Sequence, residues 1–312
     1  MKTKKSIALI CGAVGICMFT CAAAANYRIS NGYDHLKTAI KNTRKITNAT
    51  ININGELKVD DTVITTLNQL YELDSDAKML HSRSETNDLR SIINGEEPYI
   101  WETYRYNDKS YHRSLNEKNE TIYIESDFFG TPENLWDVDE QDSEMVDKLV
   151  RFMEVAVDTV VGDLRNNFVC TESADEYSAY TVTLDSVQIP EIVNAGLSMV
   201  FSMAHNSMTP PLDEQGNTVE FDSDDENYYL MLLGKDPIAE SVTLNYKIGA
   251  DKTAQSGDIQ ITFAGNGHKM IFTGDISLTN IGSTTPQTLE QQDVKIVTHN
   301  YFDEETSIEI TE

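Results

Sequence analysis

Residues 50–71 read TININGELKVDDTVITTLNQLY, in which apolar and polar side chains alternate on both sides of an acidic break at Asp60 and Asp61. Alternation with a period of two is typical of a β-strand that buries one face, because successive side chains point to opposite sides of the strand. Two such runs joined by a short polar turn predict a β-hairpin. The hairpin in turn predicts an antiparallel sheet with one face exposed.

Similar alternating runs follow the hairpin and return near the C-terminus, so we expect two meanders, at 49–125 and at 228–299. One further strand is predicted between them, at 180–184. The second meander begins with a predicted strand at 228–233, and Gly265-Asn266-Gly267 predicts its clearest hairpin turn. In total the pattern predicts about ten or eleven antiparallel strands.

Helices are indicated where apolar residues recur every three or four positions. We expect a short helix over 33–46 and a helical middle over 142–206, with one helix near 143–165. The second middle helix begins at Ile189-Pro190 and is apolar around most of its circumference, so it must be buried on several sides or line a hydrophobic cavity. Together these elements predict an α+β fold in one domain over 26–302, before an acidic tail at 303–312.

The first 25 residues have the three parts of a secretory signal peptide: three lysines, an uncharged run from Ser6 to Cys21, and small residues up to Ala25. They predict cleavage after Ala25 and an extracytoplasmic protein, secreted or at the cell surface. Two alternatives stay open. The apolar run is about 20 residues long and could remain as a membrane anchor, or Cys21 could be lipidated in a lipoprotein.

Charge and cysteine content narrow the classes of partner. The net charge is −27, and it becomes −30 without the three lysines of the first 25 residues. Such a charge repels nucleic acid, so no nucleic-acid partner is expected. Three of the four cysteines lie in the predicted signal, which leaves Cys170 without a partner for an intramolecular disulfide. We expect Cys170 to be a buried, inert thiol, and an exported protein without disulfides to be typical of Gram-positive bacteria.

No catalytic or cofactor-binding residues are predicted. The sequence contains no G-x-S-x-G or H-E-x-x-H motif, and its six histidines are scattered. A polar loop over 208–227 is expected to be a lid or to be disordered. Its acidic residues Asp222, Asp224 and Asp225 could bind a divalent cation weakly, the alternative being a solvated acidic loop.

The order of the predicted elements resembles the LolA/LolB/LppX-like superfamily of exported lipoprotein carriers. The resemblance is carried by 33–46, 50–125, the helices near 143–165 and 190–205, and 228–278. It implies a half-barrel, in which a large curved antiparallel sheet wraps two or three helices around a hydrophobic cavity. It also implies that the protein binds an acyl chain or a lipoprotein and is not an enzyme. The stretch Gln188-Ile189-Pro190 is similar to one found in Gram-positive secreted proteins of unknown role.

We therefore expect a non-enzymatic cell-envelope protein that binds a hydrophobic ligand or a protein partner in the concave face of a curved sheet. The alternative is an adhesive or sensory extracellular module with a filled core and no cavity. Aromatic residues of strand 99–106 either pack such a core or line a groove. The predicted lining residues come from the apolar helix and from that strand: Ile192, Val193, Leu197, Met199, Val200, Met203, Tyr99 and Trp101.

Overall fold

The structure is a computed structural model that describes most of the predicted meanders and part of the segments between them. The predicted signal with Cys21, the predicted helix near 143–165 and the acidic residues Asp222, Asp224 and Asp225 lie outside the described residues. The described residues are 31–43, 45–116, 118–127, 167–189, 191, 194–195, 197–198, 201–202, 226–289, 294–298 and 309–310.

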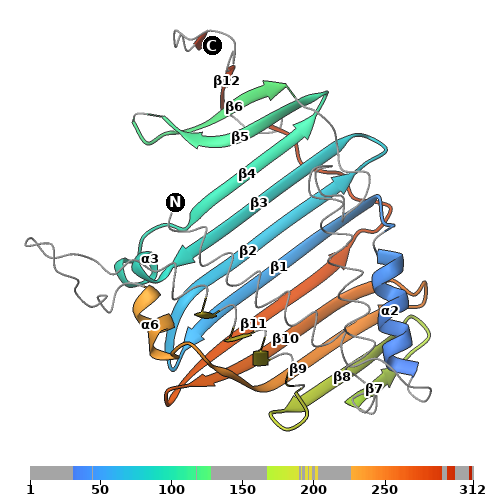
Figure 1. Ribbon diagram of the computed structural model, residues 1–312. Coiled ribbons are helices and arrows are strands. Elements are labelled where there is room, and N and C mark those ends of the chain that lie inside the picture. The colour runs from blue at the N-terminus through green and yellow to red at the C-terminus, as the bar shows by residue number, and fades with distance from the viewer. Residues whose placement is uncertain are drawn as a thin grey trace, which may run out of the picture.

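Among the described residues, thirteen strands form one sheet, and the large, curved, unclosed antiparallel sheet predicted from the sequence is confirmed (Figure 1). The strand order is β13-β12-β6-β5-β4-β3-β2-β1-β11-β10-β9-β8-β7, and every described pair is antiparallel except β6 and β12. The strands are β1 (Asn48–Val59), β2 (Thr62–Asp74), β3 (Met79–Asp88), β4 (Tyr99–Tyr106), β5 (Lys109–Leu115), β6 (Thr121–Asp127), β7 (Phe168–Ser173), β8 (Tyr177–Asp185), β9 (Ile238–Gly249), β10 (Ala254–Gly265), β11 (His268–Thr279), β12 (Lys295–Thr298) and β13 (Glu309–Ile310).

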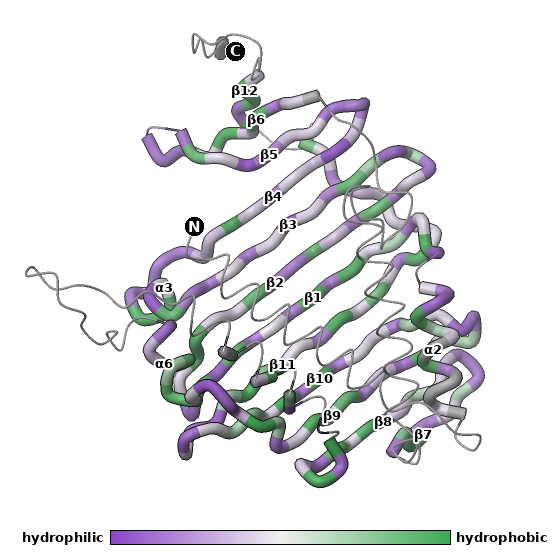
Figure 2. The backbone as a smooth tube through the Cα atoms, viewed as in Figure 1, coloured by the Kyte–Doolittle hydropathy of each residue, from purple (hydrophilic) through white to green (hydrophobic). Residues whose placement is uncertain are grey.

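The two meanders join in the middle of the sheet, where β1 pairs with β11 over the whole of their central part. Leu57 of β1 lies opposite Phe272 of β11, and both side chains are buried. Alternation then fixes the two faces of the sheet: the face that carries Leu57 and Phe272, and the opposite face, which carries Asn54 and Glu56. Hydrophobic and hydrophilic segments alternate along these strands in Figure 2.

The first of these faces, called the helical face below, is covered by helices over β1 and β8–β11. They are α2 (Asn31–Thr43), α6 (Glu226–Leu232) and a helical segment that contains Leu197 and Phe201. Leu36 and Ala39 of α2 and Leu230 of α6 are buried in the same cluster as Phe272. Burying a large apolar side chain contributes about 1.5–3 kcal/mol, so this cluster is the main source of stability among the described residues.

The opposite face is covered at the other end of the sheet, over β3–β6, by the C-terminal strap, defined as residues 280–289 and 294–298. Leu289 of the strap is buried among tyrosines of β4, β5 and β6. Thr284 fixes the start of the strap to β1. Its hydroxyl lies 2.9 Å from that of Thr50, and its backbone N–H donates to Oδ1 of Asn48 at 2.8 Å. The described helices therefore cover one face of the sheet over β1 and β8–β11, whereas the strap covers the other face over β3–β6.

Three local predictions were wrong. Residues 228–233 were expected to be a strand, but α6 runs from Glu226 to Leu232. The run is apolar without alternation, and Leu230 and Leu233, three positions apart, are buried together, which suits a helix. Cys170 was expected to be buried, but it is exposed, because β7 is the edge strand and only its first residue, Phe168, is buried.

The third wrong prediction concerns the number of elements. Among the described residues the sheet has thirteen strands, against about ten or eleven predicted, and β7 and β13 were not among the predicted strands. A short helix, α3 (Leu89–Asn94), also follows β3. Asp88 caps its start by accepting a hydrogen bond from the Ser91 backbone N–H, and Gly95, at a φ of 64°, ends it in the left-handed conformation. Within the described part of the chain, no helix has both the length and the apolar character needed to span a bilayer.

Candidate functional site

Two large aromatic side chains, Tyr99 and Trp101, are exposed at the start of β4. Tyr99 is 57% exposed and Trp101 52%. Cross-strand pairing places Tyr99 opposite Thr86 of β3, in a row with Leu67 of β2 and Gly55 of β1, so both aromatic residues lie on the helical face. Tyr99 and Trp101 therefore share one side of β4.

The helix α3, which leads into β4 and lies at the end of the sheet where that strand begins (Figure 1), also carries exposed apolar side chains. Ile92 and Ile93 of α3 are exposed and are followed within a few residues by Tyr99. We call these four residues, Ile92, Ile93, Tyr99 and Trp101, the aromatic patch. Exposed groups of large apolar side chains are typical of binding surfaces, and Tyr and Trp are enriched at the centres of such surfaces.

On the helical face, Trp101 is followed along β4 by Arg105, and His112 lies beside it on β5. The Trp101 ring centre lies 6.3 Å from that of His112 on β5. Burial lowers the pKa of His112, and the charge of Arg105 lowers it further. Both ring nitrogens of His112 have partners, with the hydroxyls of Thr103 and Ser110 at 3.1 and 3.0 Å. Because these hydroxyls belong to β4 and β5, His112 supports the pairing of the two strands.

The other predicted lining residues are either elsewhere or not described. Leu197 is buried in the core under the helical face, close to β9, where the neighbouring Asn194 accepts a hydrogen bond from the Ala239 backbone N–H at 3.0 Å. It lies several strands away from Tyr99 and Trp101 in the sheet order. The remaining five lie outside the described residues: Ile192, Val193, Met199, Val200 and Met203.

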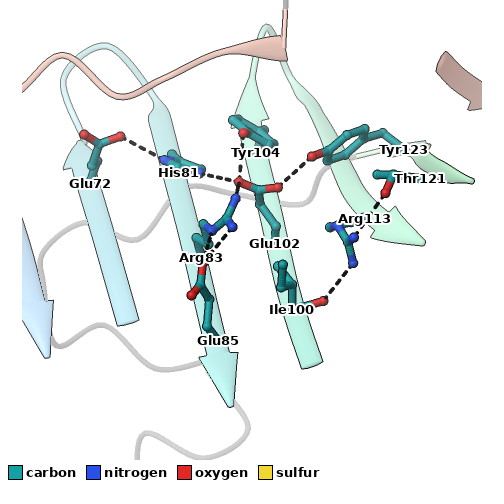
Figure 3. Close-up of polar contacts among 10 residues, drawn as sticks. All are labelled: Glu72, His81, Arg83, Glu85, Ile100, Glu102, Tyr104, Arg113, Thr121 and Tyr123. Atoms are coloured by element: carbon teal, nitrogen blue, oxygen red, sulfur yellow. Dashed lines mark hydrogen bonds and ion pairs between the residues drawn. The ribbon is translucent and has the colours of Figure 1, made fainter. Parts of the chain in front are cut away.

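A buried polar network, which the sequence analysis did not identify, lies on the opposite face under the C-terminal strap (Figure 3). His81 of β3 is 1% exposed and bridges two carboxylates. Its Nδ1 lies 2.9 Å from Oε2 of Glu72 on β2, and its Nε2 lies 3.2 Å from Oε1 of Glu102 on β4. Glu102 also accepts hydrogen bonds from the hydroxyls of Tyr104, at 2.9 Å, and Tyr123, at 2.6 Å.

These contacts shift the titration of both carboxylates and of the histidine. Burial by itself would raise the pKa of Glu102, but hydrogen bonds from His81, Tyr123 and Tyr104 outweigh it and lower the pKa to about 2. Burial likewise would lower the pKa of His81, yet its hydrogen bonds to Glu102 and Glu72 raise that pKa. The pKa of Glu72 is lowered, against its burial, by His81 and the Gln287 backbone N–H.

The network links β2, β3, β4 and β6 to one another and to the C-terminal strap. Tyr104 stacks on His81 with ring centres 4.4 Å apart, and the Gln287 N–H of the strap donates to Glu72 at 3.1 Å. Burial and Glu102 raise the pKa of Tyr123, so its hydroxyl stays protonated and keeps donating. Since each of these groups already has a partner and the strap covers them, the arrangement offers no open position for a substrate.

Metal binding has no support among the described residues, where no group of three His, Cys, Asp or Glu side chains could hold a metal ion.

No protein-family model and no characterised protein sequence matches this chain. Three solved structures are similar at low TM-scores. A LolA superfamily protein from Nitrosomonas europaea has 8% identity and a TM-score of 0.18, covering 80% of this chain and 94% of that one. A porin-like protein from Bacteroides uniformis has 10% identity and a TM-score of 0.20, covering 76% and 97%. The Pseudomonas aeruginosa MucA/MucB complex has 10% identity and a TM-score of 0.18, covering 83% and 100%.

Proposed function

We propose that this protein is a non-enzymatic, exported binding protein that holds a hydrophobic ligand or a protein partner on the aromatic patch. The observation that carries the proposal is the exposure of Tyr99 and Trp101, each more than half exposed on one side of β4. An aromatic ring of this size contributes a large contact area and needs little ordering to do so.

The rest of the described chain supports binding over catalysis. The titratable side chains with shifted pKa values around His81 are buried and already paired with one another. A catalytic acid or base has to reach the proton that it transfers. Export is supported by the composition of residues 1–25, which resembles a secretory signal.

An adhesive or sensory module with a filled core remains the second candidate. It is favoured by the tight packing of Leu57, Leu197 and Phe272 under the helical face. Native mass spectrometry of the protein from its own cells, before and after solvent extraction, separates the two candidates. An extractable lipid adduct supports the binding of an apolar ligand, and a single unliganded mass supports the module.

The aromatic patch can be tested by titrating the protein with a fluorescent fatty acid. Trp101→Ala is expected to weaken binding by about tenfold, because it removes the largest exposed ring of the patch. The matched control is Leu115→Ala, since Leu115 is 53% exposed but lies on the opposite face of β5. Equal affinities of the two variants and the unaltered protein would remove the aromatic patch as the ligand site.

A further inference from the structure

The opposite face carries a broad polar groove, which none of the preceding functions uses. It has a volume of about 540 Å³ and is formed by β9, β10, β11, β1 and β2, neighbours in the middle of the sheet (Figure 1). Asn54 lies in its lining and precedes Gly55, where an added Cβ would meet the Phe272 ring at 3.9 Å on the helical face. Since neighbouring side chains point to opposite sides, the groove lies on the face opposite to the described helices.

A straight row of polar side chains crosses the groove at right angles to the strands. The row is set by the register of the sheet, in which each member lies directly opposite the next. Four strand spacings give a length of about 19 Å, enough for a chain molecule. Its members, from β9 to β2, are Asn245, Asp258, Asp275, Asn54 and Asn68.

Hydrogen bonds along the row hold these side chains in place. Asn245 Nδ2 donates to both oxygens of Asp258, at 2.7 and 3.2 Å, and Asn54 Nδ2 donates to Asp275 Oδ1 at 2.9 Å. Thr181 of β8 donates to Asn245 Oδ1 at 2.8 Å and fixes the orientation of its amide. Fixed polar groups lose little freedom when a ligand binds.

The lining selects against most ligand classes. It includes Asp258, Asp275 and Glu56 and has no Lys, Arg or His, so phosphates and other anions are repelled. Ile259 is the one large apolar residue of the lining, but its side chain alternates with Asp258 and packs against the core of the helical face, so an acyl chain finds little to contact. Amides, carboxylates and threonine hydroxyls together supply donors and acceptors that match hydroxyl groups.

A cation is also a poor match, because the carboxylates are already partnered. Asp258 is bound by Asn245, Asp275 by Asn54, and Glu56 lies 2.7 Å from the ammonium of Lys58. None of them belongs to a group of three side chains that could hold a metal ion within the described part of the chain.

We propose that this groove binds a neutral, hydroxyl-rich chain, an oligosaccharide laid across β9–β2. The site lies on the opposite face from the aromatic patch and takes a different class of ligand, so it does not depend on the patch.

Calorimetric titration with neutral oligosaccharides (maltohexaose, cellohexaose and chitohexaose) tests the proposal. At least one of them is expected to bind. Asp258→Asn, which keeps the shape but removes a charged acceptor, and Asn68→Ala are each expected to weaken that binding by about tenfold. Gln69→Ala is the matched control, because Gln69 neighbours Asn68 on β2 but points to the helical face. Asn68 is exposed, so its variant is expected to fold.

Three results would overturn the proposal: no heat with any of these oligosaccharides, equal weakening by Asn68→Ala and Gln69→Ala, or tighter binding of Ca²⁺ or a lysine-rich peptide with the same sensitivity to Asp258→Asn. Trp101→Ala should leave oligosaccharide binding unchanged, so failure of the aromatic patch and failure of the groove can be told apart.

Discussion

At the scale of the residue, Gly265 shows how closely the sheet approaches the end of α6. A Cβ added at this position would lie 2.1 Å from the Leu233 carbonyl oxygen and 3.3 Å from Pro237 Cβ. The obstacle is backbone, which cannot rotate away as a side chain can. Glycine is therefore required here for packing, at a point where its backbone lies against the chain that leads from α6 into β9.

Gly265→Ala is expected to lower the free energy of unfolding by about 1–3 kcal/mol, because the new methyl group overpacks the contact with Leu233. Gly257→Ala in the same strand is the control. There the nearest atom to an added Cβ is the Asn245 carbonyl oxygen at 3.4 Å, so a change within about 0.5 kcal/mol is expected. Urea denaturation measures both, and equal losses of stability would contradict this account of Gly265.

His81 and Glu102 make the stability of the protein depend on pH, with opposite sign in the acidic and in the alkaline range. The folded-state pKa of Glu102, about 2, is below its ordinary value of 4.5, so its stabilisation is present above pH 4.5 and is lost as the pH falls toward 2. This loss is on the order of 3 kcal/mol. The pKa of His81 is raised above 6.5, so its stabilisation is present below pH 6.5 and is lost as the pH rises through the raised pKa.

Urea denaturation from about pH 3 to about pH 9 should therefore show greatest stability between the two ranges. His81→Gln should remove the fall on the alkaline side relative to the unaltered protein, since glutamine can donate a hydrogen bond but does not titrate. An alkaline fall of the same size in this variant would assign it to groups other than His81.

At the scale of the element, the C-terminal strap is attached to the sheet through contacts at several separate points along its described residues. Thr284 fixes its start to β1, Gln287 bonds to the buried network, and Leu289 is buried among the tyrosines. Its end, β12, pairs in parallel with β6 at the far side of the sheet. The strap therefore depends on the same network that depends on pH.

Leu289→Ala should destabilise the protein by about 2–5 kcal/mol, because it leaves a cavity under the strap. Hydrogen exchange should become faster in 284–289 and in β12 than in β9 and β10, which the strap does not touch. Ile281→Ala is the control, since Ile281 is 39% exposed and belongs to the same strap. Uniformly faster exchange over the whole sheet would show that the strap and the sheet unfold as one unit.

Sequence patterns predict a strand or helix when its burial can be read from neighbouring residues. They fail when contacts between residues that are distant in the sequence determine the structure. The β1–β2 hairpin was predicted because alternation from Thr50 to Tyr71 is a local signal. The run at 228–233 has no period that distinguishes a strand from a helix. The His81 network was missed because Glu72, His81 and Glu102 meet through the register of three strands, which no local pattern contains. The one local signal is on β3, where His81, Arg83 and Glu85 place a polar residue at every second position.

At the scale of the whole molecule, one open sheet presents two faces that are covered by different elements. Helices cover the helical face over β1 and β8–β11, and the strap covers the opposite face over β3–β6. Among the described residues, exposed aromatic side chains lie at the start of β4, and a polar groove lies in the middle of the opposite face. The two areas differ in chemistry, and we propose an apolar ligand or a protein partner for the first and a hydroxyl-rich ligand for the second.

Binding at the aromatic patch is tested most directly by photo-crosslinking in the cells that make the protein. A photo-reactive benzoylphenylalanine is placed at Trp101 in one variant and at Leu115, on the opposite face, in a second. We predict that irradiation adds a ligand or partner of defined mass at position 101 and adds nothing at position 115. No adduct at 101, or the same adducts at both positions, would contradict the claim that the aromatic patch is the binding surface.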